Sequence, residues 1–124
     1  MKLARTLVII GALLLLLSAL LHCYGYFFII PQLAATNISS DLLSAFKALW
    51  WMFSAVGILL CPIFIGLTRL PNSRGLVLLG AAIPIVTTIL LLYFVGVFIG
   101  SIGMALASVF LVIGGFLLPG DARG

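Results

Sequence analysis

The sequence contains no glutamate, and charged side chains are absent from one long stretch of it. Residues 75–120 include no Asp, Glu, Lys, Arg or His. As one helix these 46 residues would extend about 69 Å, at roughly 1.5 Å per residue. The hydrocarbon core of a bilayer is only about 30 Å thick. The stretch is therefore predicted to cross a membrane twice, with a turn near its middle.

The scarcity of charge also excludes a water-soluble domain. Only 6% of the 124 residues are charged and 65% are hydrophobic, whereas a soluble domain carries about 25% charged residues. We therefore expect a single transmembrane domain over residues 1–124, surrounded by the lipid bilayer. The net charge of +4 comes from basic residues at the ends of apolar runs, where such residues set topology and contact lipid headgroups. A nucleic-acid partner is not expected.

The same scarcity limits the chemistry that the chain can perform. The acidic residues are Asp41 and Asp121, and both fall in a predicted connection or tail. Without a carboxylate at the membrane midplane, the chain lacks the usual proton-binding group of a small four-helix drug–proton antiporter. Hydrolytic and metal-dependent catalysis are disfavoured for the same reason. We therefore expect no enzyme activity, no metal site and no cofactor.

The two cysteines, Cys23 and Cys61, both lie inside apolar runs. The predicted topology separates them by about 10 Å in membrane depth. A disulfide needs Cα atoms within about 7 Å of each other, so a bond between the two is not expected. Each is predicted to be a small buried hydrophobic side chain.

Apolar runs and turn signals divide the chain into four predicted helices. Their expected ranges are 6–30, 41–67, 76–95 and 102–118. Pro31 closes the first run, and Ser39 or Ser40 can cap the second helix. The turn between the third and fourth helices falls somewhere in residues 96–101, where glycines loosen the chain. The predicted fold class is an all-α integral membrane protein, a four-helix transmembrane bundle with short loops.

Basic residues predict the orientation, because cytoplasmic loops carry an excess of Lys and Arg. They precede the first helix, separate the second from the third, and follow the fourth, which puts them on one side of a four-span protein. These residues are Lys2, Arg5, Arg69, Arg74 and Arg123. Both termini are therefore expected in the cytoplasm. The architecture resembles that of small four-span bacterial membrane proteins, so the plasma (inner) membrane is the expected location.

Aromatic residues support the same orientation. Toward the outer ends of the helices they are predicted to form an interfacial belt, because amphipathic rings favour the headgroup level. The belt residues are Tyr24, Tyr26, Trp50, Trp51 and Tyr93.

Small residues recur on one face of several predicted helices. They let helix backbones approach closely, and close packing is a main source of helix association in lipid. The positions are Gly11, Ser18 and Gly25 on the first helix, Gly57 on the second, and Gly103, Ala107 and Gly114 on the fourth. We expect these residues at helix interfaces within the bundle. The alternative is that one of the stripes faces a partner subunit.

His22 is the weak candidate for a functional side chain, because it is the single histidine and lies inside the first apolar run. Three roles stay open: a neutral histidine hydrogen-bonded between helices, a ligand of a haem or metal shared with another subunit, or part of a proton or substrate path. Ser18 and Gly25 share its predicted face. We therefore expect His22 inside the bundle or at an interface rather than in lipid.

These observations favour a non-catalytic subunit or interaction protein of a membrane assembly, because reactive groups are few and loops are short. The partner would be another membrane protein, or a second copy in a homo-oligomer. A small oligomeric transporter or lipid-handling protein is the alternative, supported by a kink expected at Pro84 and by the polar residues Thr87 and Thr88. A redox or haem-associated membrane subunit that uses His22 is a further alternative.

Overall fold

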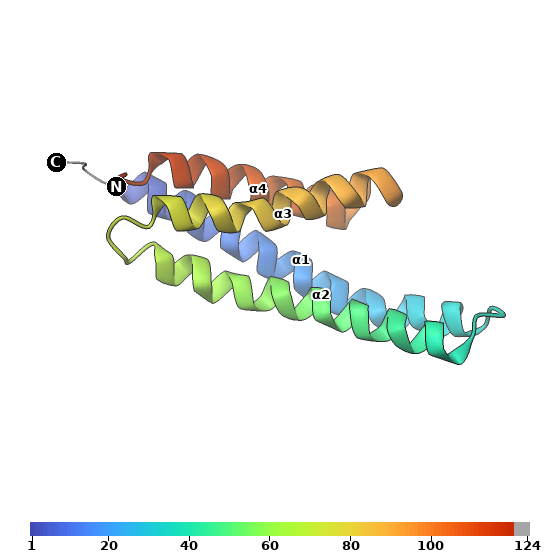
Figure 1. Ribbon diagram of the computed structural model, residues 1–124. Coiled ribbons are helices and arrows are strands. Elements are labelled where there is room, and N and C mark those ends of the chain that lie inside the picture. Colours follow the sequence, from blue (N-terminus) through green and yellow to red (C-terminus); the bar gives the residue numbers. More distant parts are fainter. Residues whose placement is uncertain (121–124) are drawn as a thin grey trace.

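The computed structural model describes residues 1–120, and within them the chain is helical apart from its short connections. Its helices are α1 (Lys2–Ala34), α2 (Ser40–Leu67), α3 (Arg74–Phe94) and α4 (Ile99–Leu117) (Figure 1). Each of the four is long enough and apolar enough to cross a membrane. The all-α class and the four membrane-length helices expected from the sequence are confirmed.

All four helices differ from their predicted ranges, and the largest differences are at both ends of α1 and at the start of α4. α1 extends four residues further at each end and continues through Pro31. Proline lacks an amide donor and its ring crowds the preceding turn, but its carbonyl can still accept. The Ala35 amide donates to the Pro31 oxygen at 3.1 Å and closes one further turn. α4 begins three residues earlier than predicted, because the Ser101 hydroxyl accepts a hydrogen bond from the Phe98 amide at 2.9 Å and caps the first turn.

Each connection is stabilised by local backbone conformation. Before α2, the Ser39 hydroxyl accepts a hydrogen bond from the Leu42 amide at 3.3 Å, so Ser39 is the one of the two predicted caps that is used. Between α2 and α3, Asn72 has a φ of 55°, which asparagine tolerates better than most residues. After α3, Gly96 has a φ of 90°, which suits a residue without a Cβ.

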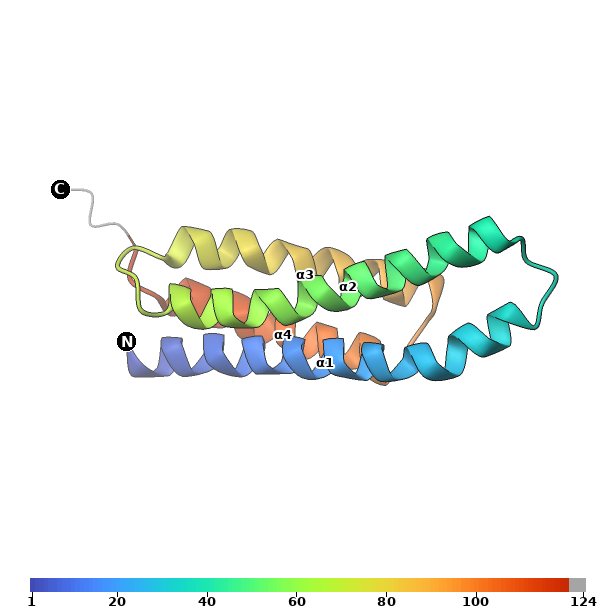
Figure 2. The same ribbon diagram turned by 90° about the horizontal axis from the view of Figure 1, so that it is seen from below.

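α1 and α4 each pack along two other helices. α1 packs along both α4 and α2, and α3 packs along α4 (Figures 1 and 2). The core lies where these helices meet, and its most buried large side chains include Val8, Leu15, Phe64, Val77 and Leu111. α2 and α3 touch at few points. The arrangement is therefore open between these two helices.

The α1–α2 pair is longer than the α3–α4 pair and extends past it at one end (Figure 2). At about 1.5 Å per residue, the 33 residues of α1 rise about 50 Å and the 19 residues of α4 about 29 Å. Gly103 lies against Ser18, and this register places His22 beside the start of α4. The remainder of α1, the connection and the start of α2 form a projecting arm, defined as residues 23–52.

Candidate functional site

At the base of the arm, the imidazole of His22 stacks on the indole of Trp50. The ring centroids are 4.2 Å apart and the ring planes differ by 10°. Phe53 approaches the same imidazole at a centroid separation of 6.2 Å. His22 is half-buried, and both of these neighbours come from α2. The histidine therefore lies at the interface between α1 and α2.

Trp50 also makes the hydrogen bond that crosses this interface. Its Nε1 donates to the backbone oxygen of His22 at 2.8 Å, which satisfies an indole N–H that would otherwise be buried without a partner. The indole can approach α1 because Gly25 has no side chain, and a Cβ there would lie 3.3 Å from Cζ2 of Trp50. The interhelical hydrogen bond at this position is thus accepted by the backbone of His22, and the imidazole contributes its ring face.

Further aromatic rings continue from this pair along the arm. Tyr26 of α1 packs against Trp51 of α2 at a centroid distance of 5.1 Å. Tyr24 packs against Phe28 at 4.9 Å, one turn further along α1. The contact between Tyr26 and Trp51 therefore adds a second aromatic bridge between α1 and α2.

The arm also exposes large apolar side chains on both of its helices. Those more than half exposed are Tyr24, Phe27, Phe28, Leu42, Leu49 and Met52. The charged residues of the arm are Asp41 and Lys47. A surface of this kind requires either lipid or a partner molecule to cover it.

The predicted belt residues differ in how far they are covered. Tyr24, Trp51 and Tyr93 are exposed, as residues in contact with lipid or headgroups would be. Tyr26 and Trp50 are half-buried, because they pack between the two helices of the arm.

No metal-ligating neighbours surround His22 in the described part of the chain. Within residues 1–120, no group of three His, Cys, Asp or Glu side chains comes together. Cys23 and Cys61 are both free thiols. A haem or metal bound through His22 would therefore need ligands from beyond the described residues.

Hydroxyl groups inside the helices donate to carbonyl oxygens of their own helix. Thr88 donates to the Pro84 oxygen at 2.7 Å, and Ser108 donates to the Met104 oxygen at 2.8 Å. Such local bonds are common for Ser and Thr in apolar helices. The hydroxyl of Thr88 is thus used within α3 and is not joined to His22 in a polar path.

Most of the predicted small residues of α1 and α4 meet one another at the interface between these helices. A Cβ at Gly114 would lie 2.8 Å from the amide nitrogen of Val8, and a Cβ at Gly103 would lie 2.6 Å from Oγ of Ser18. The predicted residues in this interface are Gly11, Ser18, Gly103, Ala107 and Gly114. These small residues therefore pack between two helices of the same chain.

Other close approaches involve α2 and α3. A Cβ at Gly57 would lie 2.7 Å from that of Ala19, so Gly57 joins α2 to α1. Sequence reasoning missed Gly115, where a Cβ would lie 2.8 Å from Leu78 of α3, and Gly80, which lies beneath the ring of Phe64. The adjacent pair 114–115 was an available signal, because neighbouring helix positions point about 100° apart and can serve two interfaces.

The predicted topology residues gather at the end of the molecule opposite the arm. Lys2 and Arg5 lie in the first turns of α1, and Arg69 and Arg74 flank the connection between α2 and α3 (Figure 1). Arg123 lies outside the described residues. The two ends of the molecule therefore differ in chemistry, with cations at one and aromatic rings at the other.

Comparison with protein-family models, with curated proteins and with solved structures finds no match for this chain. Its class is therefore defined by the fold and the site alone. The protein is all-helical over the described residues, with four membrane-length helices and an aromatic arm at one end.

Proposed function

We propose that the protein is a multi-pass protein of the plasma (inner) membrane, arranged as a four-helix bundle with both termini in the cytoplasm. The support is the distribution of charge along the helices. Basic residues gather at the start of α1 and in the α2–α3 connection, as cytoplasmic segments require. The opposite end carries Asp41 and Lys47, whose charges cancel.

Within that membrane, we propose that the protein is a non-catalytic interaction subunit and that the arm binds its partner. The unequal length of the two helix pairs carries this proposal. α4 rises about 29 Å, which matches a hydrocarbon core of about 30 Å. When α4 spans that core, much of the arm projects beyond it, although its exposed surface is rich in aromatic and aliphatic groups.

An exposed apolar surface outside the hydrocarbon core is typical of a protein-binding site. Aromatic side chains also dominate binding energy at many interfaces. The two helices of the arm are held together before binding, because Trp50 of α2 stacks on His22 of α1 and donates a hydrogen bond to its backbone oxygen. Less conformational entropy is then lost on association. The proposed partner is another membrane protein that covers the arm.

Site-specific photo-crosslinking in intact membranes tests this function. A photoreactive phenylalanine analogue replaces Phe27, which is 65% exposed on the arm, or Val109, which is 52% exposed on α4 and serves as the control. We expect a discrete protein adduct from position 27 and none from position 109. An adduct of twice the mass of the chain would identify the partner as a second copy. Lipid adducts alone at both positions would contradict the proposal.

A further inference from the structure

The turn between α3 and α4, defined here as residues 94–99, differs in chemistry from the other two connections. Residues 35–39 before α2 include three polar side chains, and residues 68–73 before α3 include four. The α3–α4 turn includes none, because its sequence is Phe-Val-Gly-Val-Phe-Ile. Turns that face water are normally polar. The composition of this turn is therefore unusual for a connection in water.

The side chains of the α3–α4 turn are among the most exposed apolar groups of the described chain. Phe94 is 75% exposed, Val97 is 78% exposed and Ile99 is 73% exposed. The turn ends short of the tip of the arm (Figure 2), and the arm leaves these side chains uncovered. Such a cluster of apolar groups requires a cover.

The backbone of the turn is bonded mainly within the chain. The amides of Val95 and Gly96 both donate to the Leu91 oxygen, at 2.9 and 3.0 Å. The Phe98 amide donates to the Ser101 hydroxyl at 2.9 Å, and the same hydroxyl donates to the Phe98 oxygen. Three of the four amides in residues 95–98 therefore have a partner that is not water. Backbone groups without a partner are costly in a membrane, so this bonding suits surroundings of low polarity.

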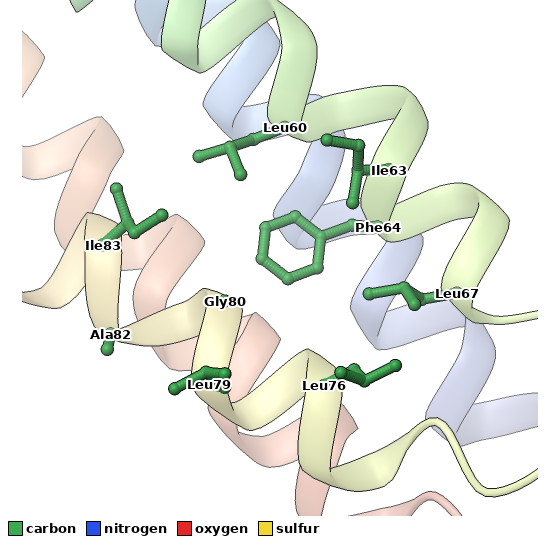
Figure 3. A pocket seen from close by; sticks show the side chains of 9 residues that line it. All are labelled: Leu60, Ile63, Phe64, Leu67, Leu76, Leu79, Gly80, Ala82 and Ile83. Carbon is green, nitrogen blue, oxygen red and sulfur yellow. The ribbon is translucent and has the colours of Figure 1, made fainter.

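An apolar surface leads along α3 to this turn. At the arginine end, a groove between α2 and α3 is lined mainly by leucine and isoleucine side chains of both helices (Figure 3). A second hollow shares Ile83 with the groove and reaches Leu90, one helical turn before Phe94. The α3–α4 turn therefore continues the apolar surface of a membrane-length helix and is not an isolated patch.

The length of α3 places the turn at a boundary of the hydrocarbon core. From Arg74 to Phe94 the helix rises about 30 Å, and the core is about 30 Å thick. With Arg74 at one boundary, the turn reaches the other one. It does not extend far beyond this boundary, because only four residues separate α3 from α4.

We propose that the α3–α4 turn is a membrane anchor that lies in the interfacial layer of the bilayer and is covered by lipid. Its exposed side chains contact the acyl chains, since apolar groups enter the boundary between headgroups and chains by about 5–10 Å. The phenol of the neighbouring Tyr93 lies at the headgroup level, which aromatic residues with a polar group favour. This inference rests on the membrane location proposed above, and it does not depend on the partner of the arm.

The anchor sets the depth from which the arm projects. His22 lies beside the start of α4, so the membrane boundary passes through the base of the arm. Residues 23–34 of α1 rise about 18 Å beyond this level. The interfacial layer is only about 5–8 Å thick on each side of the bilayer. The tip of the arm therefore stands in water while the α3–α4 turn stays in lipid.

Spin labelling of the full chain in dioleoylphosphatidylcholine vesicles tests the anchor. A nitroxide is attached at Val97→Cys, in a background where Cys23 and Cys61 are replaced by alanine. Its collisions are measured with oxygen, which concentrates in lipid, and with a nickel chelate, which stays in water. Leu70→Cys is the matched control, because Leu70 is an exposed aliphatic residue in the polar connection between α2 and α3.

Two further positions calibrate the measurement. Val109→Cys, on an exposed face of α4, marks the hydrocarbon core, and Asn37→Cys marks the water beyond the arm. We expect the label at Val97→Cys to collide with oxygen and lose most collisions with the nickel chelate, as at Val109→Cys. The labels at Leu70→Cys and Asn37→Cys should collide with the nickel chelate.

The other outcomes would overturn the anchor. Equal nickel collisions at Val97→Cys and Leu70→Cys would place the turn in water. Few collisions with either reagent at Val97→Cys would show that protein, such as a second copy of the chain, covers the turn. Nickel collisions at Val109→Cys would contradict the membrane location itself. The failure of that proposed location is thus distinguished from a failure of the anchor alone.

A charged variant tests the energetic consequence of insertion. Val97→Asp places a carboxylate in the α3–α4 turn, and charged groups are costly within the membrane. The midpoint of thermal unfolding in vesicles should fall for Val97→Asp and stay close to the wild-type value for Leu70→Asp. Equal midpoints for the two variants would contradict the anchor. Where Val97→Asp does not fold, the collisions measured at Val97→Cys still decide the question, because cysteine is close to valine in size and polarity.

Discussion

Trp50 joins α2 to α1 through two interactions that use different parts of one side chain. The face of the indole stacks on His22, and the indole N–H donates to a backbone oxygen of the same residue. Aromatic pairs contribute about 0.5–1.5 kcal/mol beyond the area they bury. Hydrogen bonds between membrane helices average about 0.6 kcal/mol. The geometry of the arm therefore depends strongly on this one residue.

Trp50→Phe should destabilise the protein by about 1 kcal/mol, because phenylalanine keeps a ring but loses the hydrogen bond. Trp51→Phe is the matched control, since Trp51 is 46% exposed and forms no hydrogen bond with α1. Denaturant unfolding in detergent, followed by helical circular dichroism, measures both variants. Equal shifts for the two would contradict the special role of Trp50.

His22→Phe should be tolerated to within about 1 kcal/mol, because a phenyl ring can still stack on Trp50. The hydrogen bond from Trp50 is accepted by the backbone and does not need the imidazole. His22→Ala removes the ring and should be less stable than His22→Phe in the same unfolding experiment. The absorption spectrum of the purified complex is the second readout. Loss of a haem band in a fully assembled His22→Phe variant would show that the imidazole is a ligand.

At the scale of the helices, α1 and α4 are held together by the closeness of their backbones. Gly103 and Gly114 each receive an atom of α1 within 3 Å of the position where a Cβ would be. Lipid is as apolar as the side chains, so hydrophobic burial does little to join helices in a membrane and close packing takes its place. The α1–α4 interface should therefore be the part of the fold most sensitive to added volume.

Gly114→Ala should weaken this interface by about 1–3 kcal/mol, as extra volume in a packed core usually does. The added Cβ would lie 2.8 Å from the Val8 amide nitrogen, a backbone atom that cannot rotate away. Gly66→Ala in α2 is the control, because nothing lies within 4 Å of its Cβ position. Thermal stability in detergent should fall for Gly114→Ala and not for Gly66→Ala. A Gly114→Ala variant as stable as the wild type would argue against close helix approach there.

The presence of four apolar helices follows from where charges are missing, but the relative shift of the two helix pairs does not. The length of the uncharged segment 75–120 shows that the chain must turn back within it. The sequence of this segment does not identify the helix against which it packs. The register of α4 on α1 depends on which pairs meet, such as Gly103 with Ser18. The register depends on the surfaces of both helices, so the periodicity of residues within one helix cannot predict it.

The candidate site was likewise predictable only in part. Helical spacing puts His22 on one face with Ser18 and Gly25, which indicated that His22 would face another part of a protein. The stack on Trp50 was not predictable, because it depends on how α2 is rotated about its own axis. The groove between α2 and α3 was also hidden, since its lining residues are ordinary leucines and isoleucines. Its shape arises from the two helices being held by different partners.

At the scale of the whole molecule, the two ends have different chemistry. The arginine end has a short connection and an apolar groove between α2 and α3. The opposite end has the aromatic arm proposed to bind a partner. With both termini in the cytoplasm, the groove would open to the cytoplasmic leaflet and the arm would lie on the outer side. The orientation therefore decides on which side of the membrane the partner of the arm must be sought.

Cysteine labelling in intact cells tests this orientation, in a background where Cys23 and Cys61 are replaced by alanine. Asn37→Cys places a thiol at the tip of the arm, and Leu70→Cys places one in the α2–α3 connection, where both native residues are exposed. Ser73 lies in the same connection but is only 3% exposed, so a cysteine there would react poorly. A membrane-impermeant maleimide should label Asn37→Cys directly and Leu70→Cys only after permeabilisation, because Arg-rich connections face the cytoplasm. The reverse pattern would turn the arm toward the cytoplasm and the arginine end toward the outer side.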